Sequence, residues 1–212
     1  MVTEIERSWA MIRAWLERSL PGSLTQAPDT SMEPSTLASP LMPMADIQAW
    51  WRCTAELVGG MDRIGLLPPG YAPLSPQDAH AQGALLSRTR NEVLRDVLPS
   101  PDAVQIWDRE PAGSPQRLAW LPSWLPLGMD VMGGLLFADL RDGPLRGAVR
   151  SFSHDGGAGE RIHWPSVRSM LADIAAGLSN GTPVDGYLAH ADKEGQLRWR
   201  PTFQAPLTRA GR

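Results

Sequence analysis

The sequence predicts an α+β domain: a central, mostly antiparallel sheet flanked by helices, with an N-terminal helical arm. Apolar residues recur every three to four positions in the first half of the chain and again near 167–178, which is typical of amphipathic helices. Alternating segments follow one another as hairpins at 134–153 and 187–199. Because these strands do not alternate with helices, an antiparallel sheet is favoured over a parallel one.

Capping and turn residues set the expected ends of the helices. Thr3 and Glu6 match a capping box at the start of the first helix, and Ser75-Pro76 places proline at the first helical position of the third. In that third helix the stripe expected to face inward is Leu86, Val93, Leu94 and Val97. The predicted helices are 3–20, 45–58, 75–98 and one that begins at 166 and ends at 180.

The strands are expected mainly in the second half of the chain. A strand is predicted at 103–107, a hairpin at 134–140 and 146–153, and a last hairpin at 187–191 and 196–199. A glycine-rich loop is expected at 154–159. The domain organisation follows: residues 1–43 are a helix and a Pro/Ser/Thr-rich linker packing on the domain, 44–200 are a single domain, and 201–212 are a flexible tail.

Composition and charge narrow the class of function. The net charge of −3 is spread along the chain, so no segment has the basic surplus that binding to DNA or RNA requires. The single cysteine, Cys53, excludes an internal disulfide and is expected to be a buried, inert thiol. No apolar run is long enough to cross a bilayer, and no signal-peptide pattern opens the chain. We therefore expect a cytoplasmic protein with no membrane contact and no cofactor.

The stretch from 120 to 199 carries a combination of motifs. It contains WLPLGMDVMGGLLFADL at 124–140, then GPLRGAV at 143–149, His154-Asp155, and a helix opened by WPSV at 164–167. This combination closely resembles the SUKH superfamily, in particular its Smi/Knr cell-wall-assembly-regulator branch in the actinobacterial form. One departure is that no Asn-Gly follows Leu67-Pro68 and Tyr71, and the chain runs instead into the 75–98 helix.

The resemblance implies a single α+β domain that binds another protein and catalyses no reaction. Bacterial relatives are typically immunity proteins that neutralise toxins, often nucleases, whereas fungal relatives are scaffolds that regulate wall synthesis. Two alternatives stay open beside an immunity protein: a housekeeping scaffold linked to envelope assembly, and a metal-dependent hydrolase. The partner's identity and the oligomeric state are left open.

Nine tryptophans give the first candidates for a partner surface. Trp9, Trp50, Trp51 and Trp164 have the spacing or helix-start position of core residues. The loop-flanking tryptophans are the candidate contacts, together with the acid of the family motif and the first two residues of the glycine loop: Trp107, Trp120, Trp124, Trp199, Asp130, His154 and Asp155.

The candidate metal ligands lie in and just after the predicted glycine-rich loop. His154, Asp155 and His163 are of the right type but lie around flexible glycines, so a solvated turn is favoured over a metal site. Asp130 is expected to cap a turn ahead of Gly133-Gly134, and Asp139 to end its strand by accepting a hydrogen bond from turn backbone.

Overall fold

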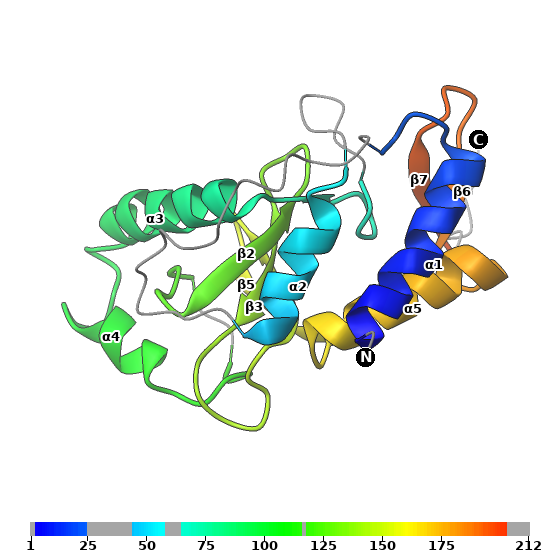
Figure 1. Cartoon of the computed structure of the whole chain (residues 1–212). Coiled ribbons are helices and arrows are strands. Elements are labelled where there is room, and N and C mark those ends of the chain that lie inside the picture. Colours follow the sequence, from blue (N-terminus) through cyan, green and yellow to red (C-terminus); the bar gives the residue numbers. More distant parts are fainter. Residues whose placement is uncertain (1–2, 25–43, 58–64, 116–117, 203–212) are drawn as a thin grey trace, which may run out of the picture.

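A computed structural model describes residues 3–24, 44–57, 65–115 and 118–202 of the chain. Figure 1 shows the arrangement of its helices and strands. The helices are α1 (Glu4–Ser19), α2 (Ala45–Thr54), α3 (Pro76–Val93), α4 (Ala103–Asp108) and α5 (Val167–Asn180). The strands are β1 (Ala72–Pro73), β2 (Trp124–Met129), β3 (Leu135–Asp139), β4 (Ala148–Ser153), β5 (Gly157–Trp164), β6 (Tyr187–Ala191) and β7 (Leu197–Pro201).

The main sheet has five strands in the order β1-β2-β3-β4-β5, and every neighbouring pair is antiparallel. Strands β6 and β7 form a separate two-stranded sheet. The register pairs Leu136 with Ser151 across β3 and β4. Between β4 and β5 the register shifts, because Arg150 pairs with Ile162 while Phe152 pairs with Ala158. The extra β5 residues form a bulge beside Ser151.

The helix ends follow local chemistry. Thr3 and Glu6 bond reciprocally as a capping box, and the Ser75 hydroxyl accepts from the Asp78 N–H. Ser166 caps α5 in the same way, and Gly181 ends it in the left-handed conformation. The predicted starts of these three helices and the two predicted hairpins are confirmed.

One hydrophobic core joins the helices to the sheet. Helix α1 packs along α5, as Figure 1 shows, and its buried face contributes Ile5, Trp9, Ile12 and Leu16 to that core. The α+β prediction with an N-terminal helix is therefore confirmed. Trp50, Trp51 and Trp164 are buried as expected, and Cys53 is buried with them.

Three local predictions are wrong. Residues 103–107 belong to helix α4, because a five-residue segment of four apolar residues and Gln105 fits either period and tertiary packing decides. Val93 is 77% exposed and Val97 69%, so the inward stripe of α3 is confined to Ala79 and Leu86. The expected glycine loop is shorter, because β5 already begins at Gly157.

The remaining boundaries differ only slightly. Helix α2 ends at Thr54, four residues before the predicted end at 58. The strand β2 was not predicted, because nearly all its residues are buried and the segment shows no alternation. Residues 25–43 of the linker predicted at 21–43, and residues 203–212 of the tail predicted at 201–212, lie outside the described residues.

Candidate functional site

A pocket opens at the end of the main sheet where β2 passes to β3 and β4 passes to β5. Antiparallel pairing brings these two turns to the same end, and the residue just before β1 joins them. The pocket has a volume of about 270 Å³. We call it the sheet-end pocket; it is lined by Tyr71, Asp130, Gly134, Ser151, Phe152, Ser153, Gly156, Gly157 and Gly159.

The β2–β3 turn is fixed by Asp130. Its Oδ1 accepts from the backbone N–H groups of Met132 and Gly134, at 2.8 Å each, as the turn-capping prediction expected. The two residues at the tip of this turn, Val131 and Met132, are 98% and 83% exposed. We call this pair the apolar tip. A large apolar side chain that stays in water on a braced turn contributes nothing to the core, which suggests a role in contact.

His154 connects the second turn to the first. A Cβ atom at Gly133 would lie 2.9 Å from the Nε2 atom of His154, so the imidazole lies close against this glycine. Gly133 also has a φ of +81°, a conformation that favours glycine. Arg90 of α3 donates to the His154 carbonyl, and its guanidinium lies 5.9 Å from the centre of the Phe152 ring. Both turns are thus held in fixed positions around the pocket.

A second polar chain begins inside the pocket. Ser151 Oγ lies 3.1 Å from Nε2 of His163, and Nδ1 of His163 lies 2.8 Å from Oδ2 of Asp185. The Asp185 side chain is 6% exposed and also pairs with Arg161. Because a carboxylate only accepts, Nδ1 of His163 donates to Asp185; in the neutral form of the ring, Nε2 is then the acceptor for the Ser151 hydroxyl. The order of groups is that of a nucleophile, a base and an orienting acid.

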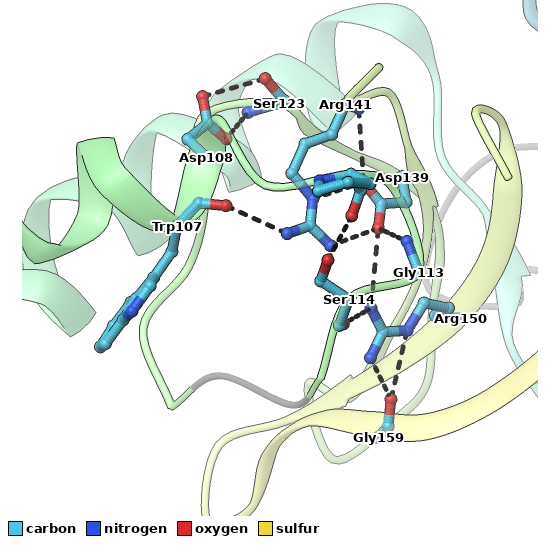
Figure 2. Close-up of polar contacts among 10 residues, drawn as sticks. Trp107, Asp108, Gly113, Ser114, Ser123, Asp139, Arg141, Arg150 and Gly159 are labelled. Atoms are coloured by element: carbon cyan, nitrogen blue, oxygen red, sulfur yellow. Dashed lines mark hydrogen bonds and ion pairs between the residues drawn. The ribbon is translucent and has the colours of Figure 1, made fainter. Parts of the chain in front are cut away.

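A buried ion network reaches Gly159 of the pocket lining, and Figure 2 shows its contacts. Asp139, Arg141 and Arg150 have no exposed side-chain surface. Asp139 Oδ2 lies 2.7 Å from Nη2 of Arg141 and 3.6 Å from Nη1 of Arg150. Arg150 in turn donates from Nε and Nη2 to the Gly159 carbonyl at 3.2 and 2.7 Å. The network thus connects the strand β3 to Gly159, a residue of the pocket lining.

Further bonds of this network reach the segment before β2. The Arg141 guanidinium donates to the Trp107 carbonyl, and Arg150 to the Ser114 carbonyl. Asp139 accepts from the Gly113 N–H, which confirms the predicted bond to turn backbone. Burial alone would raise the pKa of Asp139, but the hydrogen bonds from Arg141 and Gly113 outweigh it and hold the pKa below its ordinary value.

Three of the tryptophans predicted as partner contacts are buried and do not line the sheet-end pocket. Trp120 and Trp124 are each 1% exposed and form an aromatic cluster with Phe137 and Phe152. They cannot touch a partner in this structure, so that prediction is wrong for both. The reason is that the two rings fill the space between α3 and the sheet. Trp199 is also buried, in the two-stranded sheet, where it donates to the Gly65 carbonyl.

Trp107 is partly buried against the core on α4. Of the seven predicted contact residues, the structure brings Asp130 and His154 together, with Asp155 exposed beside them. Sequence reasoning missed the apolar tip, Ser151 and Asp185. The spacing from Ser151 to His163 and from His163 to Asp185 carries no local signal, because the bulge and the 184–187 turn bring them together.

The structure also shows the surroundings of the candidate metal ligands and of the single thiol. His163 is engaged by Ser151 and Asp185, while His154 lies against Gly133. Among the described residues, no group of three or more His, Cys, Asp and Glu side chains could hold a metal ion. Burial raises the pKa of Cys53 to about 11. No described helix has the length and apolar character needed to span a membrane.

No protein-family model and no curated protein matches the chain. The site therefore has to be interpreted from its own geometry.

Proposed function

We propose that this chain is a non-catalytic protein-binding module of the SUKH type that contacts its partner through the sheet-end pocket and the apolar tip. The observation that supports this most strongly is the position of Val131 and Met132, exposed on a turn that Asp130 braces. A rigid apolar anchor loses little conformational entropy on binding, which is how interface hot spots gain affinity.

Its surroundings suit a protein partner better than a nucleic acid. Asp130 directly precedes the tip, exposed Asp155 follows His154, whose ring lies near Gly133, and the net charge of the chain is −3. Acidic groups at a contact surface repel a phosphate backbone. The polar rim around an apolar centre is the usual anatomy of a protein interface. We place the protein in the cytoplasm, where a single buried thiol such as Cys53 stays reduced.

We propose further that the partner is a toxin, which the module would neutralise by covering its active surface. The motif run at 124–140, which resembles immunity proteins of the SUKH superfamily, supports this role. The second candidate is a scaffold for envelope or wall assembly, which the Smi/Knr resemblance supports equally. The two roles use the same contact surface and differ in the partner's identity.

A hydrolase is the third candidate, and the Ser151–His163–Asp185 chain is the observation that favours it. Asp185, however, shares its carboxylate with Arg161. An arginine on that carboxylate lowers its ability to stabilise a protonated imidazole, which is the task of the acid in such a triad. Ser151 also lies within the strand β4 instead of on a sharp turn that exposes its hydroxyl. We therefore favour a structural role for the Ser151–His163–Asp185 hydrogen bonds.

Site-specific photo-crosslinking tests the binding proposal. A photoreactive phenylalanine analogue replaces Met132 in one variant and Val97 in the other, since both side chains are well exposed. In the native host, a protein cross-linked from position 132 and not from 97 supports the proposal. A partner captured equally from both positions, or from 97 alone, contradicts it. Growth rescue on co-expression with the captured protein separates a toxin from a scaffold component.

A further inference from the structure

We propose that the sheet-end pocket binds an arginine side chain presented by the protein partner. This inference rests on the proposed binding function and specifies the chemistry of the partner. The pocket's volume of about 270 Å³ lies just below the range of about 300–1,000 Å³ that is usual for small-molecule sites, so one long side chain fits it better than a cofactor.

The polar side chains of the lining are the Asp130 carboxylate and the hydroxyls of Tyr71, Ser151 and Ser153. Both hydrogen bonds of the Asp130 carboxylate in the β2–β3 turn go to Oδ1 and neither uses Oδ2. A Cβ atom at Gly134 would lie 2.6 Å from that Oδ2, so glycine at this position leaves room beside the carboxylate. The Ser151 hydroxyl is hydrogen-bonded to Nε2 of His163, and in either direction of that bond its oxygen keeps a lone pair for a donor from the pocket.

The pocket wall adds one aromatic side chain. Tyr71 lines it, whereas the Phe152 ring, although that residue is also in the lining, packs in the core against Trp120 and Trp124. Burial, and after it the charge of Asp130, raises the pKa of Tyr71 to about 12, so its ring is neutral at physiological pH. A neutral aromatic face attracts a cation. A carboxylate, a hydroxyl acceptor and the Tyr71 ring in one cavity match a guanidinium, which is planar, carries five donors and stacks on rings.

The lining contains no lysine or arginine to compete for Asp130. Arg90 contacts the Phe152 ring, but it is not part of the lining and its guanidinium donates to the carbonyls of Leu118 and His154. The apolar tip stands directly after Asp130 in the chain, so an arginine flanked by apolar residues on the partner would meet both surfaces together. The occupant is therefore a basic residue within an apolar patch of a protein.

A titration of the ¹⁵N-labelled full chain tests this directly, with N-acetyl-arginine N-methylamide as the probe. Citrulline N-methylamide, acetylated in the same way, is the matched control because it has the same shape and no charge. We expect saturable shifts of the Gly134, Gly156, Gly157 and Gly159 amide signals with a Kd of about 1–10 mM for arginine, and none for citrulline.

Asp130→Asn should abolish the arginine shifts, because asparagine keeps an acceptor for the two turn N–H groups but loses the charge. Asp155→Asn removes the same charge from an exposed neighbour outside the pocket and should change the Kd by less than about twofold. Equal shifts with citrulline, no shift at these glycines, or full arginine binding by Asp130→Asn would overturn the inference. Such a result would leave the crosslinking test of Met132 untouched, so the two proposals fail separately.

Discussion

Arg150 donates two hydrogen bonds from its fully buried guanidinium to the single carbonyl of Gly159, at 3.2 and 2.7 Å. Gly159 is part of the pocket lining, and Arg150 also lies within ion-pair distance of Asp139 in the core. The position of this lining residue thus depends on a buried charge network. The stability of the domain and the geometry of its candidate site are linked through this one carbonyl.

Removal of the central carboxylate should be costly. Asp139→Asn leaves the charges of Arg141 and Arg150 buried without their anion, and a loss of about 3–5 kcal/mol in the free energy of unfolding is expected. Urea denaturation measures it. Asp142→Asn is the matched control, because Asp142 pairs with Arg146 at the surface and its loss should cost less than about 1 kcal/mol. Equal costs for the two variants would contradict the importance of the network.

The contribution of the Asp139 carboxylate to the free energy of unfolding should decrease in acid. The pKa of Asp139 is lowered in the folded state, so its contribution is complete above the unfolded value of about 3.9 and is lost as pH falls through the folded value. The difference in unfolding free energy between the wild type and Asp139→Asn should therefore shrink below about pH 4. Chemical denaturation from pH 2 to 7 checks this, and a difference that grows towards low pH would contradict it.

Cys53 should be unreactive in the folded protein. Burial raises the pKa of its thiol to about 11, and the thiolate is the reactive form. With a disulfide reagent at pH 7.5, we expect the one cysteine to react only in denaturant. Rapid modification of the native chain would show that α2 opens readily and that the thiol is accessible.

The Ser151–His163–Asp185 chain should not act as a hydrolytic triad. A fluorophosphonate probe is expected to leave Ser151 unlabelled, and Ser151→Ala should hydrolyse p-nitrophenyl acetate as slowly as the wild type. The reason is that the Arg161 guanidinium pairs with the Asp185 carboxylate, which lowers the ability of that carboxylate to stabilise a protonated imidazole. Stoichiometric labelling at Ser151, found by mass spectrometry, would favour the hydrolase candidate over binding.

The predictable parts of the fold are those with local signals. Thr3 with Glu6, Ser166 before α5 and Gly181 after it specify helix ends within a few residues of sequence. In β7, buried Leu197 and Trp199 alternate with exposed residues, the period of two that one-sided burial imposes, whereas β3 is buried throughout. The segment at 103–107 has too few residues to distinguish the two periods, and its contacts with the core made it a helix.

The candidate site was only partly predictable. Asp130 lies in a turn motif, and His154 next to glycines, so both could be selected from the sequence. The burial of single side chains could not be predicted from the sequence. Trp124 is of a residue type common at interfaces but lies in the core, whereas the Met132 side chain is exposed to solvent. The network from Asp139 to Gly159 could not be predicted either, because it joins residues through sheet pairing and a bulge.

The affinity of the cross-linked partner for tip variants tests the binding proposal most directly. Titration calorimetry would compare the wild type with Val131→Ser/Met132→Ser and with Val97→Ser, an exposed apolar control. We expect the tip variant to raise the Kd by roughly 30-fold or more, as a hot spot of about 2 kcal/mol would, with unfolding free energies unchanged. An unchanged Kd for the tip variant, or an equal loss for Val97→Ser, would contradict the proposal that this turn docks the partner.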